Sequence, residues 1–285
     1  MDMAPEIDAA AIDADVRACD PAKPFGDVRL VAGLDTANDE GNPSLSADEL
    51  TIYLFSNRQS PGTADLDAYV ATRATRDAAF GALGAITAIN TTADERGGSL
   101  STDGLALFFH SSRTGEHDLY VSTRPNLAAP FGAPTSLGAG VNTADHDQTP
   151  SISADGQVLY FTRTPAAGGA SSIYRASAGP TGFTNATAIT ELSASAASSV
   201  QPTLSADGLT IYFSSDRTGG AGSLDVWVAT RPSLTAAFAQ ITNVTELNSD
   251  RFEFLDWISP DGCRVYFTSG RNGGGWDTWQ ATRPL

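Results

Sequence analysis

The chain has 285 residues and a formal net charge of −16, with 41% apolar and 8% aromatic residues. Phosphate binding needs clustered Lys and Arg, so this charge argues against nucleic-acid partners and against adsorption to anionic membranes. No apolar run is long enough to span a bilayer. Cations, cationic ligands, sugars and basic partners stay open, and the charge is also compatible with solubility alone.

The first segment, residues 1–24, is rich in Ala and Asp and has neither the basic nor the apolar region of a signal peptide. It is predicted to be a flexible, acidic tether. Either the protein stays in the cytoplasm, or it is exported by a signal that this sequence does not contain. The scarcity of Lys and the abundance of small polar residues favour export, so the predicted location is periplasmic or secreted.

One phrase then recurs along the whole chain at intervals of about 52–55 residues, a spacing typical of propeller blades. Its copies are NPSLSADELTIYLFSNR from Asn42, GGSLSTDGLALFFHSSR from Gly97, TPSISADGQVLYFTRT from Thr149, QPTLSADGLTIYFSSDR from Gln201 and LDWISPDGCRVYFTSGR from Leu255.

Each copy predicts four strands. A short first strand leads into an S-x-D-G turn, where Asp bonds the turn backbone and Gly supplies positive φ. A β-branched and aromatic run such as residues 209–213 is typical of the second strand, and D-L-Y-V-A-T-R of the third. No stretch has sustained helical periodicity. The predicted fold is therefore all-β: a five-bladed β-propeller of four-stranded antiparallel blades.

The last repeat stops at Leu285 after three strands. The missing piece lies at the other end of the chain, because residues 25–35 match residues 131–142 of the second repeat. The N-terminal strand is therefore predicted to complete blade 5, which removes two open sheet edges. The predicted domain is 25–285, undivided and monomeric.

The two cysteines, Cys19 and Cys263, fall on either side of this predicted closure. Cys263 opens the second strand of blade 5, and Cys19 precedes the strand that completes that blade. In an up-and-down sheet both points lie at the same rim. A disulfide that staples the ring is the favoured interpretation for an exported protein, and two unrelated thiols are the alternative.

Acidic residues recur just before the first strand, at the rim where ligand loops usually project. The equivalent positions hold Glu40, Glu95, Asp147, Ser199 and Glu253, and His146 adjoins one of them. If the four carboxylates converge on one channel mouth, hard oxygen ligands in a flexible ring favour Ca²⁺. A solvated acidic rim is the alternative.

Other residues depart from the repeat or complete it. Trp257 stands where the other blades carry Ser or Thr, and it either fills a gap or forms an aromatic wall for a ligand. The arginine that ends the second strand, as in Arg113, is predicted to pair with the Asp that begins the third, as in Asp118. The three histidines lie at non-equivalent places in the repeat, which does not favour a shared metal site.

The phrase S-x-D-G-x-x-(I/L)-Y-F-x-S-x-R-x-G…D-(I/L)-Y-V resembles the WD40-like (PD40) repeat of TolB-type propellers. The resemblance covers four blades well and the third in part. It implies a propeller fold and, more weakly, a periplasmic or surface protein that serves as a binding platform.

The favoured function is therefore a non-catalytic binding or scaffold propeller of the cell envelope or exterior. Its acidic channel mouth would hold a cation, a sugar, another small ligand or a protein partner. The alternative is a glycosidase-like carbohydrate enzyme that uses two of the channel carboxylates. A purely structural ring is the third hypothesis. No catalytic motif such as G-x-S-x-G or HExxH occurs.

Overall fold

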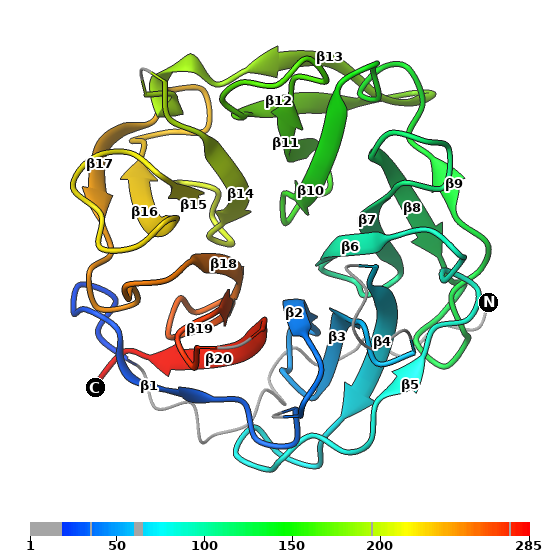
Figure 1. Ribbon diagram of the computed structural model, residues 1–285, viewed down its shortest axis with the longest axis horizontal. Coiled ribbons are helices and arrows are strands. Elements are labelled where there is room, and N and C mark those ends of the chain that lie inside the picture. Colours follow the sequence, from blue (N-terminus) through cyan, green and yellow to red (C-terminus); the bar gives the residue numbers. More distant parts are fainter. Residues whose placement is uncertain (1–18, 35, 60–64, 195, 274) are drawn as a thin grey trace, which may run out of the picture.

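The computed structural model describes residues 19–34, 36–59, 65–194, 196–273 and 275–285. Five four-stranded sheets stand around a central axis, with the first strand of each innermost (Figure 1). All pairings within the sheets are antiparallel. The predicted five-bladed, all-β propeller is confirmed. In the described part of the chain the helical content is one short turn, η1 (Thr190–Leu192), and no helix there has the length and apolar character to cross a membrane.

The blades follow one another in chain order, each running from the axis outward. Blade 1 is built from β2 (Glu40–Leu45), β3 (Thr51–Ser56), β4 (Asp67–Thr72) and β5 (Gly84–Ala85). Blade 2 is built from β6 (Glu95–Leu100), β7 (Ala106–Ser111), β8 (Asp118–Thr123) and β9 (Thr135–Ser136). Blade 3 is built from β10 (His146–Ile152), β11 (Val158–Thr164), β12 (Ser172–Gly179) and β13 (Gly182–Ala188). Blade 4 is built from β14 (Ser199–Leu204), β15 (Thr210–Ser215), β16 (Asp225–Thr230) and β17 (Ala239–Asn243).

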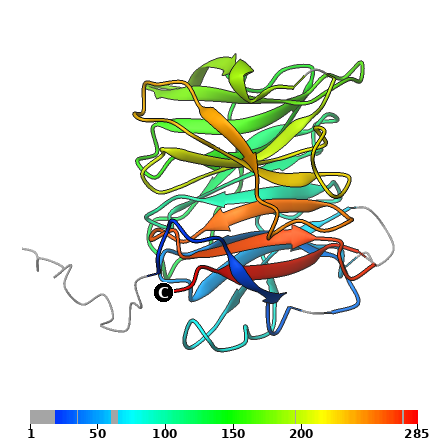
Figure 2. The ribbon, with the colours of Figure 1, turned by 90° about the vertical axis from the view of Figure 1, so that its left-hand side faces the viewer.

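Blade 5 joins the two ends of the chain. Its strands are β18 (Glu253–Ile258), β19 (Arg264–Ser269), β20 (Asp277–Thr282) and, as the outer strand, β1 (Gly26–Leu30). β1 pairs with β20 in the register Gly26 to Thr282 and Leu30 to Trp279. Figure 2 shows the blue N-terminal strand beside the red C-terminal one. The predicted closure by the N-terminal strand is confirmed, and it covers the outer edge of β20.

The turns between first and second strands follow the predicted chemistry. In blade 2 the hydroxyl of Ser101 donates to Asp103 at 2.6 Å, and the N–H of Leu105 donates to the same carboxylate oxygen at 3.0 Å. Gly104 supplies a φ of 71°. In blade 1 this left-handed position is occupied by Glu49, with a φ of 62°. Its buried carboxylate lies 3.3 Å from Arg264 and 3.6 Å from Arg73, so the ion pairs fix the unusual turn.

The blades are held together by an arginine that follows the third strand. Arg231 lies 4.4 Å from the ring centre of Phe238 and donates to Tyr160 of the preceding blade at 3.2 Å. The same arrangement occurs at Arg73 with Tyr266 and at Arg283 with Tyr212. Blade 3 has lost this arginine, and blade 2 carries Phe108 at the matching tyrosine position. Phe108 instead packs edge-on against Phe183 at 6.0 Å.

Residues 19–24 belong to the folded part of the chain. The N–H of Asp20 donates to the carbonyl of Pro284 at 3.0 Å, and Lys23 donates to the carbonyl of Leu285 at 2.5 Å. Cys19 and Cys263 form a disulfide with a Cα–Cα distance of 5.6 Å. The predicted tether of residues 1–24 is therefore not loose over 19–24, and its residues 1–18 lie outside the described residues.

Removal of the disulfide by Cys19→Ser together with Cys263→Ser is expected to lower the free energy of unfolding by about 2–4 kcal/mol. The bond joins two residues 244 positions apart in the chain, so its loss returns much chain entropy to the unfolded state. Urea unfolding followed by tryptophan fluorescence measures the change. Reduction of the wild type should reproduce the double variant, and equal midpoints before and after reduction would contradict the expectation.

Candidate functional site

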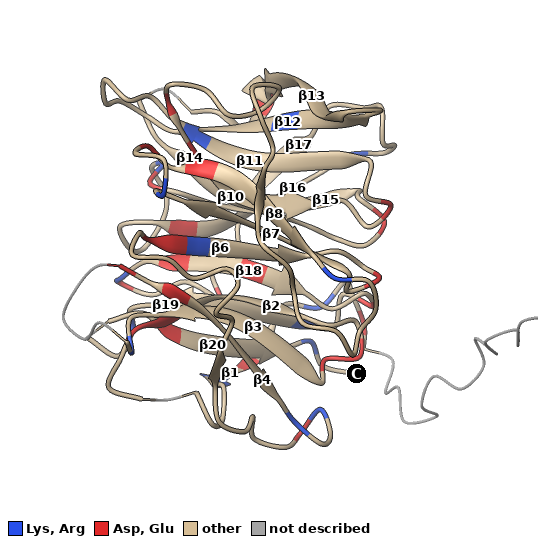
Figure 3. Cartoon of the chain, turned by 90° about the vertical axis from the view of Figure 1, so that its right-hand side faces the viewer, with Lys and Arg blue, Asp and Glu red and all other residues tan. Residues whose placement is uncertain are grey.

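The four acidic residues predicted at the channel mouth lie at the starts of the first strands, where their side chains are fully buried. Each carboxylate has its own arginine from the same blade rather than facing the other three. The pairs are Arg58–Glu40 at 2.7 Å, Arg113–Glu95 at 3.1 Å, Arg163–Asp147 at 2.7 Å and Arg271–Glu253 at 3.4 Å. Figure 3 shows the acidic start of β6 in red; the blue segment beside it is the next residue of that strand, Arg96, which pairs with Asp94 and not with Glu95. The structure therefore does not bring the four residues into one site.

Glu95 illustrates the role of this position. It accepts from the N–H and hydroxyl of Thr91 at 3.0 and 2.7 Å, and from the hydroxyl of Ser111 at 2.8 Å. Arg113 also donates to the carbonyl of Ile89 at 2.9 Å. The carboxylate thus ties the loop that enters the blade to the end of its second strand. A Thr or Ser four residues before each acid was the sequence signal for this structural role.

The predicted pairing of these arginines with the third-strand Asp is wrong. Arg113 pairs with Glu95, whereas Asp118 accepts from the hydroxyl of Thr114 at 3.0 Å. In blade 4, which lacks the acid, Arg217 donates to the hydroxyl of Ser199 at 3.0 Å. The long arginine side chain extends across the first and second strands to the acidic residue. The order of residues in the sequence does not predict this contact.

A shared calcium ion needs several oxygen ligands around one point. Among the described residues no three His, Cys, Asp or Glu side chains are grouped in a way that could hold a metal. Burial raises the pKa of Glu40, and hydrogen bonds from Thr36 and the charge of Arg58 oppose this shift. Each of these four carboxylates is paired with a guanidinium group, and calcium binding stays a prediction.

The three histidines lie side by side although their places in the repeat differ. The ring centres of His110 and His117 are 5.2 Å apart, and those of His117 and His146 are 5.7 Å apart. His110 is buried and its Nδ1 accepts the N–H of Thr149 at 3.2 Å. Burial lowers its pKa well below the ordinary value. It is therefore a neutral link between blades 2 and 3, at a position where blades 3, 4 and 5 carry Thr162, Ser214 and Thr268 and blade 1 carries Phe55.

His146, the predicted ligand residue, approaches Glu116 with its Nδ1 at 3.0 Å. Across the same end of the channel, Phe252, Phe254 and Trp276 form an aromatic cluster with ring centres 5.4–6.0 Å apart. Arg96 lies 5.2 Å from the centre of the Trp276 ring. The aromatic rings and Arg96 contact one another, whereas the buried Nδ1 atoms of His117 and His146 have no hydrogen-bond partner among the described residues.

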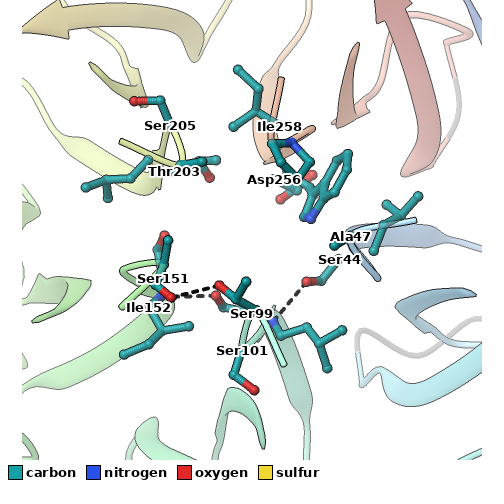
Figure 4. A pocket seen from close by; sticks show the side chains of 18 residues that line it. Ser44, Ala47, Ser99, Ser101, Ser151, Ile152, Thr203, Ser205, Asp256 and Ile258 are labelled. Carbon is teal, nitrogen blue, oxygen red and sulfur yellow. Dashed lines mark hydrogen bonds between the residues drawn. The ribbon is translucent and has the colours of Figure 1, made fainter. Parts of the chain in front are cut away.

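A cavity of about 130 Å³ lies at the other end of the first strands, beside the turns into the second strands (Figure 4). All five blades contribute equivalent positions to its wall. Its lining residues are Ser44, Leu45, Ala47, Ser99, Leu100, Ser101, Thr102, Ser151, Ile152, Ala154, Thr203, Leu204, Ser205, Ala206, Asp256, Trp257, Ile258 and Pro260.

A ring of hydroxyls joins neighbouring blades in this wall. Ser44 accepts the N–H of Leu100 at 3.0 Å, and Ser99 accepts the N–H of Ile152 at 3.1 Å. Thr203 donates to the carbonyl of Leu255 at 2.8 Å. Trp257 takes the equivalent place in blade 5 and lines the cavity, with its ring edge-on to Tyr266 at 5.7 Å. Trp257 thus lies beside the channel, and its role in binding a ligand stays a prediction.

Asp256, the residue before Trp257, is the functional candidate that the sequence interpretation missed. Its equivalents in the other blades are Pro43, Gly98, Pro150 and Pro202. In those blades the residue just before, such as Asn42 or Gln201, has a positive φ. In blade 5 regular pairing extends to Leu255, so Asp256 becomes the bulged residue. A carboxylate in place of Pro or Gly was the available sequence signal.

The bulge places the Asp256 carboxylate deep in the ring and beside the cavity (Figure 4). Asn42 of blade 1 and Gln201 of blade 4 donate to one of its oxygens at 3.2 and 2.6 Å. Thr268 donates to the other oxygen at 2.6 Å. Burial raises the pKa of Asp256 to about 7, and these hydrogen bonds offset only part of that shift. The three donors are neutral, so the carboxylate has no cationic partner among the residues that bond it.

Comparison with known proteins gives a fold relationship. No protein-family model matches the chain, and no curated protein matches its sequence. TolB from Acinetobacter baumannii is a similar solved structure, with 18% identity and a TM-score of 0.51 over 87% of this chain. The match spans 56% of the TolB chain.

Two enzymes are also similar in structure. A thermostable family-43 glycoside hydrolase has 10% identity and a TM-score of 0.60, with 89% of this chain and 91% of that chain covered. The gluconolactonase XC5397 from Xanthomonas campestris has 15% identity and a TM-score of 0.53, with 92% of each chain covered. Because all these identities are low, the comparisons show a shared propeller fold, with TolB and two enzymes among the similar structures.

Proposed function

We propose that the protein is a non-catalytic binding propeller of the cell envelope or exterior, and that its central cavity at Asp256 and Trp257 takes a small ligand. The main support is that blade 5 departs from the repeat at two adjacent positions, Asp256 and Trp257, and that both residues line the same cavity. A purely structural ring would need only the Pro or Gly and the Ser or Thr that the other blades carry at these two positions. A concave wall of apolar and aromatic side chains with a few convergent polar groups, as found here, is typical of ligand sites.

A binding role is favoured over glycoside hydrolysis by the number of acids. Hydrolysis of this kind needs one protonated carboxyl and one ionised partner about 5–9.5 Å away. Asp256 is the single carboxylate in the cavity wall among the described residues. The acids at the strand starts are each engaged by an arginine. The glycosidase alternative rests on the fold relationship alone.

An exported location is part of the proposal. The Cys19–Cys263 disulfide suits an oxidising compartment. The fold relationship to TolB and the repeat are compatible with it.

A fragment screen followed by NMR of the tryptophan indole N–H signals tests the site. Polar fragments of up to about six heavy atoms are expected to shift the Trp257 signal at millimolar concentration and to leave that of Trp276, at the opposite end, in place. Trp257→Phe and Trp276→Phe assign the two signals and serve as matched controls. A screen in which no fragment moves the Trp257 signal would remove the cavity as a binding site.

The same protein should be inactive on a broad panel of polysaccharides. Hydrolysis that is present in the wild type and lost in Asp256→Asn would show an enzyme and would overturn the non-catalytic proposal.

A further inference from the structure

We propose that the ligand of the central cavity is a small organic ammonium ion whose positive charge pairs with the carboxylate of Asp256. This inference rests on the proposed function, because it names the ligand class for the same cavity. The inference is based on the negative charge of the Asp256 carboxylate, which has no counterion among the described residues of the cavity wall. The described residues that line the cavity include no Lys, Arg or His.

The rest of the chain shows how this protein neutralises its buried carboxylates. Glu40, Glu95, Asp147 and Glu253 each have an arginine within 3.4 Å, and Glu49 has Arg264 at 3.3 Å. Asp256 instead receives amide and hydroxyl donors from Asn42, Gln201 and Thr268. Asp256 is partly exposed and lines the cavity, so a cation supplied from outside can reach the carboxylate and act as the counterion that the protein does not provide.

The groups around Asp256 favour an ammonium ion over a metal ion. Asn42 and Gln201 present amide nitrogens to the carboxylate, whereas a hard metal ion needs oxygens there. The hydroxyl ring that includes Ser99 and Ser151 offers acceptors for the remaining N–H groups. Trp257 supplies an aromatic ring beside the same carboxylate, and indole is the best partner for a cation.

The volume of the cavity and the apolar residues of its outer wall indicate the size and character of the part of the ligand that is not the ammonium group. A cavity of about 150 Å³ holds a molecule of benzene, so the volume of about 130 Å³ here suits about five or six heavy atoms. Leu100, Ile152, Leu204 and Ile258 line the wall beyond the hydroxyl ring. An alkyl chain of four or five carbons would contact these side chains while its ammonium group reaches Asp256.

Titration with n-butylammonium chloride and with 1-butanol tests the inference, since the two probes have the same number of heavy atoms and differ in charge. Sodium chloride keeps the ionic strength equal. At pH 8 we expect butylammonium to bind about tenfold more tightly than butanol, as judged by the Trp257 indole signal and by calorimetry. In Asp256→Asn the two affinities should agree within about twofold.

Binding should also depend on pH. The side chains that face Asp256 from β2, β14 and β19 are Asn42, Gln201 and Thr268, and those across the cavity on β6 and β10 are Ser99 and Ser151. None of them titrates near neutrality. Since burial holds the pKa of Asp256 at about 7, butylammonium affinity should rise from pH 5.5 to pH 8 while butanol affinity stays level.

The outcomes separate this inference from the proposed function. Equal affinity for the two probes in the wild type would overturn the ammonium ligand and leave the cavity as a binding site. Binding of neither probe would overturn the ammonium ligand, and the fragment screen would then decide whether the cavity binds anything. Calcium chloride that displaces butylammonium at equal ionic strength would identify a metal site instead. If Asp256→Asn does not fold, the wild-type pH dependence and Trp257→Ser, which should weaken butylammonium more than butanol, decide the question.

Discussion

The free energy of unfolding of Asp256→Asn, measured relative to that of the wild type, is expected to be about 3 kcal/mol higher at pH 8 than at pH 5. In the folded protein burial raises the pKa of this carboxyl to about 7, above its unfolded value of about 3.9. Between these two values the folded state holds a proton that the unfolded state has lost. The wild type therefore loses stability as pH rises toward 7. The Asn variant has no carboxyl at this position and does not show this loss.

Urea unfolding of both proteins at pH 5, 6.5 and 8 measures the effect. The quantity of interest is the difference between variant and wild type at each pH, because the amide also changes the hydrogen bonds to Asn42 and Gln201 equally at every pH. Asp77→Asn is the control, since its carboxylate is 88% exposed. A difference for Asp256→Asn that stays constant across the three pH values would contradict the expectation.

The second large effect concerns the arginine–carboxylate pairs, and it is asymmetric. Arg113→Met is expected to cost about 3–5 kcal/mol of unfolding free energy, because it leaves the fully buried Glu95 without its cation. Glu95→Ser is expected to cost about 1 kcal/mol. Blade 4 already carries this arrangement, in which Arg217 bonds the hydroxyl of Ser199 and the carbonyl of Leu192.

Chemical unfolding of the two single variants and of the double variant at pH 7 measures these terms. In the double variant the buried charge is gone, so most of the loss caused by Arg113→Met should be recovered. Equal costs for the two single variants would show that the pair is an ordinary surface salt bridge. Additive costs in the double variant would show that the two side chains act independently.

Much of the architecture could be predicted because it repeats locally. The turn with Asp103 and Gly104, the aromatic second strand and the spacing of the phrase each require only neighbours in sequence. The missing fourth strand of the last repeat and the match of residues 25–35 to an outer strand predicted the closure that β1 and β20 form. Cys19 and Cys263 could be placed at one rim by the same counting.

The candidate site could be predicted only in part. The alignment of the repeats predicted that Glu40, Glu95, Asp147 and Glu253 lie at one level of the ring. It did not predict which way their side chains turn. Strand alternation sends them into their own blades, where arginines neutralise them. Trp257 could be singled out as a departure from the repeat. Asp256 was not, because its surroundings depend on a bulge and on one additional strand pair, Leu255 with Phe267, that blade 5 forms.

The sequence by itself thus determined the number of blades, their strand order and the closure, since each follows from a local pattern repeated at a fixed spacing. The tertiary structure alone decided the surroundings of Asp256. Asn42 lies 214 positions away from it in the chain and Gln201 lies 55 positions away. Both reach one carboxylate only because closing the ring brings blades 4 and 1 against the two sides of blade 5.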